Sequence, residues 1–257
     1  MPELVEIESY RRLADRVVGR AIVRVDAPDA WFIKDGNTQR SLRQALRARV
    51  ITGTRRIGKL LLLDTDGPTL GLRFGMTGRL VVDGVEGVDE LIYSSRRKDP
   101  AWDRFSLRFD TGFLTINDPR RLGGVILNPD ESRLGPDAMT VTRSVFRGAL
   151  ASDAPIKARL MDQARLAGVG NLTADEVLWR AGIAPHRTAR SLDADEVKRL
   201  HQQLRRVLRD LDQRGGSHTG DVIEHRTAGG ACPRDGSPLA RATVGGRTTW
   251  WCPQHQR

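Results

Sequence analysis

Cysteine and long hydrophobic runs are scarce in this sequence, and each scarcity excludes a class of protein. Only two cysteines occur, Cys232 and Cys252, so the chain is not a secreted scaffold built from disulfides. The run of leucines at 60–63 is far too short to cross a bilayer. The first residues include acids and lack the apolar core of a secretory signal, so we expect a cytoplasmic protein with no membrane partner.

Acidic residues are also in the minority. Lys and Arg number 42 against 32 Asp and Glu, which gives a formal net charge of +10. Such a charge favours a polyanionic partner, although many small basic proteins bind none. The 257 residues suffice for one large domain or for two modest ones, each with its own core.

The hydrophobic pattern divides the chain into a β-rich half and a helical half. Tyr10, Leu13 and Val17 recur at helical spacing near the start. From residue 21 to 127 the pattern changes to short β segments separated by turn residues, which indicates an antiparallel sandwich or barrel. Residues 128–140 contain two prolines and three acids and form the predicted linker.

Helical periodicity follows this linker. The clearest predicted helix covers 194–214. Asp193 together with Glu196 would cap its N-terminus, and two glycines follow it. Its apolar stripe consists of Val197, Leu200, Leu204, Val207, Leu208 and Leu211. The sequence therefore predicts an α+β protein, and its expected parts are residues 1–127, the linker at 128–140, a helical domain at 141–221 and a small hairpin at 222–257.

Pro2 and Glu3 form a candidate catalytic pair. Removal of Met1 would leave Pro2 with a secondary α-amine. An α-amine titrates near ~8, so roughly a quarter is neutral near pH 7.5, whereas a lysine at ~10.4 offers about one part in a thousand. A neutral amine can attack a sugar C1′ and form a Schiff base, with Glu3 as proton donor or acceptor. Pro-Glu is also consistent with ordinary capping of a helix.

The two cysteines belong to a repeated pattern near the end of the chain. Cys232 and Asp235 form one Cys-x2-X unit, and Cys252 and His255 form a second after sixteen intervening residues. At the ends of a hairpin these four side chains would surround one point, and zinc accepts thiolate, imidazole and carboxylate in tetrahedral geometry. The alternative is a hairpin without zinc in which two thiols are buried.

Two glycine-containing turns precede groups that suit phosphate binding. Asn171 follows Gly168 and Gly170 and is predicted to be the N-cap of a helix. The exposed backbone amides at the start of this helix would bind phosphate. Arg247 follows Gly245-Gly246, a turn that would project its guanidinium from a hairpin. The alternatives are a helical corner capped by asparagine and a solvated arginine.

Three further residues lie in turns of the β-rich half. Lys59 comes directly before a buried strand, where it would contact phosphate or assist chemistry. The alternative is a solvated lysine at the end of a strand. Met76 and Arg120 lie in the turns RFGMTG and NDPRRLG, from which exposed side chains can probe a base stack. Met76 is equally consistent with a core position.

Taken together, these segments resemble the formamidopyrimidine-DNA glycosylase and endonuclease VIII family along the whole chain. The segments that match in family order are PELVEIE, RFGMTGRL, INDPRRLG, IKARLMDQ, GVGNLTADEVLWRAGI and VGGRTTWWCPQHQ. The resemblance implies an N-terminal β-sandwich, then a helix–two-turn–helix domain with a zinc ribbon. It also implies a bifunctional DNA glycosylase and AP lyase that flips an oxidised base out of duplex DNA. We expect it to act as a monomer.

The resemblance assigns a role to each candidate residue. Pro2 resembles the nucleophile, Glu3 the acid/base, and Lys59 a catalytic lysine in a β-hairpin. Among DNA contacts, Lys157 matches a lysine near the lesion, Asn171 and Arg247 match phosphate ligands, and Met76 and Arg120 match residues that fill the space left by the flipped base. The zinc positions correspond to Cys232, Asp235, Cys252 and His255.

The sequence departs from the family pattern at three places. Asp235 and His255 replace two of the four usual ligand cysteines, and both remain competent zinc ligands. Leu122 stands where a phenylalanine wedge is common. Only fifteen residues separate Gly216 from Cys232, too few for the lid of the 8-oxoguanine-specific branch, which argues against that specificity.

Two other functions are compatible with parts of the sequence. One is a damage-sensing protein on the same scaffold that binds DNA without catalysis, and the other is an RNA-binding protein built on the helical half. Intact Pro2, Glu3 and Lys59 favour the enzyme over both. The lesion range, the opposite-base preference and the choice between β and β,δ elimination stay open.

Overall fold

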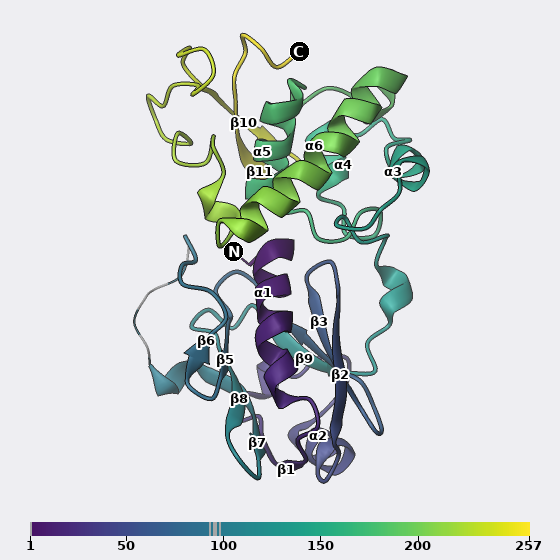
Figure 1. Ribbon diagram of the computed structural model, residues 1–257, viewed down its shortest axis with the longest axis vertical. Helices are drawn as coiled ribbons and strands as arrows, with labels where there is room; N and C mark the ends of the chain where they lie inside the picture. Colours follow the sequence, from purple (N-terminus) through teal and green to yellow (C-terminus); the bar gives the residue numbers. More distant parts are fainter. Residues whose placement is uncertain (1, 93, 95–96, 98) are drawn as a thin grey trace. The chain divides into compact units, whose positions relative to one another are not determined.

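The chain divides into two structural units, residues 1–131 and 132–257 (Figure 1). The computed structural model describes residues 2–92, 94, 97 and 99–257. Both large sheets belong to the first unit and the longest helix belongs to the second, so the predicted α+β class is confirmed. Among the described residues, no helix is both long enough and apolar enough to cross a membrane.

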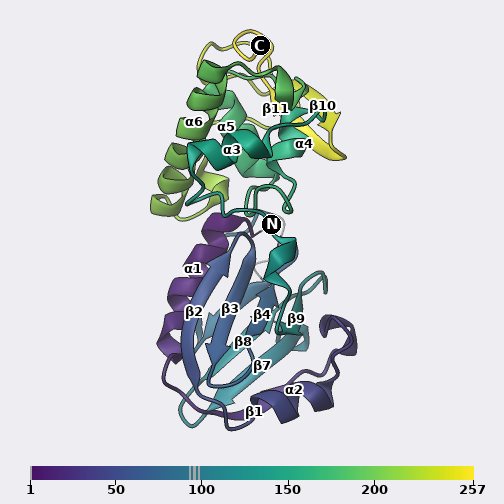
Figure 2. The ribbon, with the colours of Figure 1, turned by 90° about the vertical axis from the view of Figure 1, so that its right-hand side faces the viewer.

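The first unit is a sandwich of two antiparallel sheets (Figure 2). One sheet has the order β1-β7-β8-β5-β6 and the other has the order β2-β3-β4-β9. Their strands are β1 (Ile22–Asp26), β2 (Ile51–Ile57), β3 (Leu60–Thr65), β4 (Leu70–Arg73), β5 (Arg79–Val82), β6 (Val85–Glu86), β7 (Asp103–Phe109), β8 (Phe113–Asn117) and β9 (Gly124–Leu127). Leu61, Leu72, Phe105 and Ile116 from both sheets meet in one buried core.

Two helices accompany this sandwich. Helix α1 (Leu4–Ala14) buries Tyr10 and Leu13 in the same core, as their helical spacing predicts, and Val17 is buried in the 3-10 turn that follows it. Helix α2 (Gln39–Leu46) was not predicted, because it is short and offers only Leu42 and Leu46 as a buried repeat among segments with a strand pattern. Its N-terminus is closed by a capping box of the side chains and backbone of two polar residues.

The second unit is mainly helical. Its helices are α3 (Arg143–Ala149), α4 (Ile156–Leu160), α5 (Asn171–Ala181) and α6 (Ala194–Gln213), and its hairpin consists of β10 (Ala240–Val244) and β11 (Arg247–Trp251). Helix α6 matches the prediction closely: Asp193 caps it together with Glu196, and its apolar stripe is buried. The N-cap prediction for Asn171 is wrong, because Gly170 takes that position and Asn171 is the first helical residue. The glycine has extended backbone angles there, so the helix starts one residue earlier than an asparagine cap would place it.

Candidate active site and metal centre

Pro2 and Glu3 lie at the entrance to α1, and both are buried. Glu3 is the N-cap residue, and its backbone N–H donates to the Glu6 carboxylate at 2.7 Å. The capping role that the sequence offered as an alternative is therefore present. A capped helix start fixes the backbone of Glu3, and so holds the preceding proline in a defined place.

Lys59 lies in the two-residue turn between β2 and β3, beside Gly58 with φ +57°. The Arg56 guanidinium connects this turn to α1: its Nε donates to a Glu8 carboxylate oxygen at 3.0 Å, and its Nη1 donates to the Gly58 carbonyl at 3.0 Å. Only 6% of the Arg56 side chain is exposed, so the ion pair is shielded from water. The start of α1 and the β2–β3 turn consequently share one end of the first unit (Figures 1 and 2).

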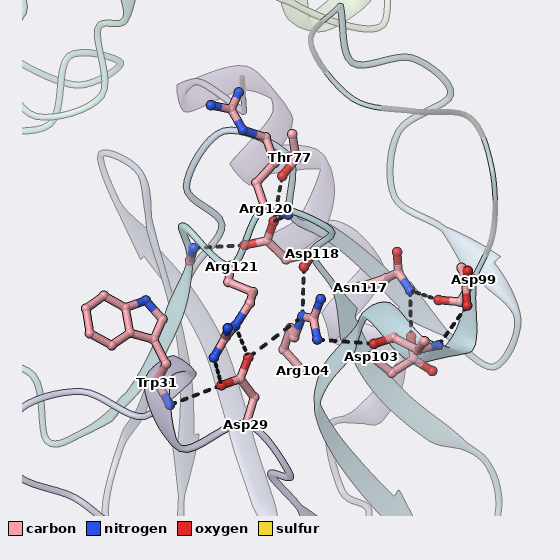
Figure 3. A network of polar contacts seen from close by, with 12 residues as sticks. Asp29, Trp31, Thr77, Asp99, Asp103, Arg104, Asn117, Asp118, Arg120 and Arg121 are labelled. Atoms are coloured by element: carbon pink, nitrogen blue, oxygen red, sulfur yellow. Dashed lines mark hydrogen bonds and ion pairs between the residues drawn. The ribbon is translucent and has the colours of Figure 1, made fainter.

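Met76 and Arg120 come from two loops that touch. Met76 is half-buried in the turn before β5, and Arg120 is exposed in the loop before β9. A Cβ built on Gly75, which has φ +56°, would lie 2.4 Å from the backbone carbon of Leu122, so the two backbones are in direct contact. The Arg120 guanidinium has no hydrogen bond or ion pair with any described residue, and it extends away from the network in Figure 3.

Asn171 and Arg247 occupy the start of α5 and the tip of the hairpin in the second unit. Within the described chain, the Asn171 Oδ1 atom is buried without a hydrogen-bond partner. Arg247 is exposed directly after the Gly245-Gly246 turn, whose φ angles are +58° and +71°. A Cβ on Gly245 would lie 2.8 Å from that of Ala158, so the hairpin tip rests against α4.

Lys157 is fully buried between α4, α5 and β11. Its Nζ atom lies 2.6 Å from an Asp175 carboxylate oxygen and donates to the Thr249 hydroxyl at 2.7 Å. The Arg226 guanidinium lies 2.9 Å from the other Asp175 oxygen. Burial raises the pKa of Asp175, and the two cations act against that rise. We call Lys157, Asp175 and Arg226 the buried ion cluster, and it joins the hairpin to α5.

Cys232, Asp235, Cys252 and His255 converge on one point, as their spacing predicts. Their ligand atoms all lie within 4.8 Å of one another, and this group could hold a metal ion. The Cys232 sulfur is 3.7 Å from His255 Nδ1, which is 2.9 Å from Asp235 Oδ2. The Asp235 Oδ2 atom is in turn 3.2 Å from the Cys252 sulfur. Tetrahedral ligands with bonds of about 2.0 to 2.3 Å lie roughly 3.3 to 3.8 Å apart, so the donor set fits such an ion.

Surrounding groups prepare these four atoms for a cation. The His255 Nε2 atom lies 3.2 Å from the Trp179 carbonyl, and donation there leaves Nδ1 as the free lone pair. Hydrogen bonds from the Ser237 hydroxyl and backbone N–H lower the pKa of Asp235, which favours the carboxylate. Burial raises the pKa of Cys252, so its thiolate needs a cation. The Trp179 indole N–H donates to the Cys232 sulfur at 3.3 Å.

Sequence reasoning missed the residues that support these groups. Asp118, whose carboxylate accepts hydrogen bonds from Thr77 and Gly123, stands inside INDPRRLG, and Asp175 stands inside GVGNLTADEVLWRAGI, yet neither was assigned a role. Their position inside two of the segments that match the family was the available signal. Arg226 and Arg56 gave no such signal, because the sequence contains many arginines and does not tell which of them are buried.

Comparisons with known proteins give one consistent result. The model of the formamidopyrimidine-DNA glycosylase N-terminal domain matches residues 1–125, and that of the helix–two-turn–helix domain of the same proteins matches residues 134–221. A formamidopyrimidine-DNA glycosylase of Heliobacterium modesticaldum is 35% identical over 100% of both chains. One of Arabidopsis thaliana is 32% identical over 100% of this chain and 71% of its own length. A Lactococcus lactis formamidopyrimidine-DNA glycosylase, solved bound to DNA with an AP site, superimposes over 100% of both chains with TM-score 0.84 and 27% identity.

Proposed function

Because the chain belongs to the formamidopyrimidine-DNA glycosylase family, we propose that it excises oxidised bases from duplex DNA and then cleaves the strand as an AP lyase. One observation carries the catalytic part of this proposal. Pro2 and Glu3 begin the helix that Glu8 and Arg56 tie to the Lys59 turn. The Pro2 amine, the Glu3 carboxylate and the Lys59 amine are thus held at one end of one unit, as a nucleophile and its proton carriers require.

The proposed reaction begins on the Pro2 amine after Met1 has been removed. The nitrogen forms a bond to the sugar C1′ as the bond from C1′ to the base breaks, and the base leaves with a proton. Opening of the sugar ring places a proton on O4′ and leaves an iminium between Pro2 and C1′. Glu3 and Lys59 are the groups we assign to these proton transfers. Loss of a proton from C2′ then expels the 3′ phosphate, and hydrolysis of the iminium releases Pro2.

The DNA contacts that we propose come from both units. Met76 and Arg120 fill the space vacated by the flipped base, and Asn171 and Arg247 bind the phosphates beside it. Lys157 is buried, which favours an indirect contribution: it positions β11, and hence Arg247, through Thr249. We propose that the active form is a cytoplasmic monomer, and light scattering of the protein–DNA complex would test its stoichiometry.

Borohydride trapping on DNA with an abasic site tests the catalytic proposal. The wild-type chain should form a covalent adduct, and Pro2→Gly should lose it while retaining most DNA binding. Pro68→Gly, in a turn between β3 and β4, is the matched control and should trap normally. DNA binding by the wild type without any adduct would instead support the non-catalytic damage sensor.

We also propose that the four-residue group at the C-terminus holds one structural zinc ion. Cys232, Asp235, Cys252 and His255 would be its ligands, and the ion would fix the ends of a hairpin too small to bury a core of its own. Elemental analysis should find one zinc per chain in wild type and none in Cys252→Ser. Arg241→Ala, an exposed change in β10, should keep the metal. Full activity without stoichiometric metal would contradict this assignment.

A further inference from the structure

The turn of Gly75, Met76 and Thr77 and the loop from Asp118 to Gly123 are joined by one buried side chain. The Asp118 carboxylate is fully buried, and its Oδ1 atom accepts a hydrogen bond of 2.6 Å from the Thr77 hydroxyl. The other oxygen accepts from the Gly123 N–H at 2.8 Å (Figure 3). A single carboxylate therefore connects the turn that carries Met76 with the far end of the other loop.

Asp118 also shapes the loop in which it lies. The Arg120 backbone N–H lies 3.2 Å from the same Oδ1 atom, and the Arg104 guanidinium donates to the Asp118 carbonyl at 2.9 Å. With the Gly123 contact, the carboxylate closes the segment into a compact loop. Such a loop has little freedom to rearrange without losing buried hydrogen bonds.

A second anchor fixes the direction of the neighbouring side chains. Arg121 has φ +58°, an uncommon angle for a residue with a side chain, and its guanidinium makes two hydrogen bonds of 2.6 and 2.7 Å to Asp29. Figure 3 shows the Arg120 and Arg121 side chains running in opposite directions. Arg120 is exposed, and Leu122 has 49% of its surface exposed, so both are presented to solvent while Arg121 is held.

We infer that Asp118 is a positioning residue that locks Met76, Arg120 and Leu122 into one rigid unit for insertion into DNA. The inference rests on the proposed function, in which Met76 and Arg120 replace the flipped base, and it adds Leu122 to them. Insertion into a base stack requires that several side chains arrive together in a fixed geometry. The hydrogen bond between Thr77 and Asp118 is the only one of the Asp118 carboxylate contacts given above that crosses between the two loops, so it is the bond to remove.

Thr77→Val tests the inference, because valine keeps the shape of threonine and removes only the hydroxyl. The matched control is Thr115→Val, which removes a buried hydroxyl paired with Ser106 at 2.9 Å within the sheet. Asp118→Asn is the stronger variant: an amide has one acceptor oxygen, so the backbone N–H of either Arg120 or Gly123 loses its partner. Thermal unfolding of all three proteins shows which of them fold.

The specific readout is the fluorescence of 2-aminopurine placed opposite a stable abasic analogue in a duplex. This fluorescence reports the restacking caused by insertion. Thr77→Val should lower the rate of this signal and of single-turnover base excision by about tenfold, as expected for a hydrogen bond to a charged group. Borohydride trapping at a preformed abasic site should change by no more than about twofold, because the Pro2 chemistry is untouched. Equal fluorescence and excision rates in Thr77→Val and Thr115→Val would overturn the inference. Absence of trapping in the wild type would instead refute the proposed function.

Discussion

Replacing Asp175 with asparagine should destabilise the second unit more than any single removal of a cation from the buried ion cluster. The change leaves Lys157 and Arg226 facing each other without an anion, with side-chain exposures of 0% and 7%. Breaking a buried pair in this way costs about 3–5 kcal/mol, because an uncompensated charge stays buried. In a unit the size of residues 132–257 this corresponds to a fall in melting temperature of roughly 10–20 °C.

The charges left in the buried ion cluster set the expected order of stability among its variants. Lys157→Met leaves one anion and one cation, so it should cost less than Asp175→Asn, about 1–3 kcal/mol. The double variant leaves Arg226 as a single buried cation, one fewer than Asp175→Asn leaves, so it should be more stable than the sum of the two single changes predicts. Asp162→Asn removes a 3.4 Å pair whose carboxylate is 41% exposed, and as a control it should change stability by less than about 0.5 kcal/mol.

Thermal and urea unfolding of the four variants, followed by tryptophan fluorescence, measures these differences. Duplex binding should weaken in Asp175→Asn at temperatures where the unit is still folded, because the hairpin that carries Arg247 loses its attachment to α5. Strict additivity of the two single changes would refute the electrostatic argument. A smaller loss for Asp175→Asn than for Lys157→Met would refute it as well.

Three further outcomes follow from individual contacts. Glu3→Gln should lose base excision and keep part of the strand cleavage at a preformed abasic site, measured on paired oligonucleotides, since the Schiff base there needs no base departure; equal retention of both would remove Glu3 from the mechanism. Arg247→Ala should weaken binding to all duplexes and flatten the log–log salt dependence by roughly one unit, and an unchanged slope would place the side chain in bulk solvent. The hydrogen bonds from Arg121 lower the pKa of Asp29, so this contact stabilises the fold above the unfolded value of about 3.9 and its contribution is lost as pH falls through the lower folded value. The stability difference between wild type and Asp29→Asn should therefore shrink in unfolding curves below about pH 4, and a difference that grows would contradict the assignment.

Much of the fold follows from patterns that span many residues. Helix α6 carries an apolar stripe over its whole length, with a cap at Asp193, and the prediction matches the structure to within a residue or two. The strands of the first unit alternate or form leucine-rich runs between turn residues. This pattern predicted an antiparallel sandwich or barrel, and the structure has the sandwich. Helix α2 was missed because two leucines one turn apart do not outweigh the strand pattern around them.

Candidate residues with a distinctive spacing were easier to predict than those that support them. The metal-binding group came directly from two Cys-x2-X units, since a turn of that length brings both side chains to one point. Asp118 and Asp175 act through partners far along the chain, Thr77 and Arg226 respectively. No local pattern encodes such pairs, because they depend on which loops and helices meet in the folded chain.

The C-terminal hairpin shows why both kinds of residue are needed for one function. Its open end is fixed by Cys232, Asp235, Cys252 and His255, whose donors suit a cation. Its tip rests on α4 through Gly245, and the strand beside it is held by Lys157 through Thr249. A metal ion alone would fix only the open end and leave the tip free to pivot. The buried ion cluster removes that freedom, so the position of Arg247 depends on charges buried in the helical unit as well as on the ligands that the sequence displays.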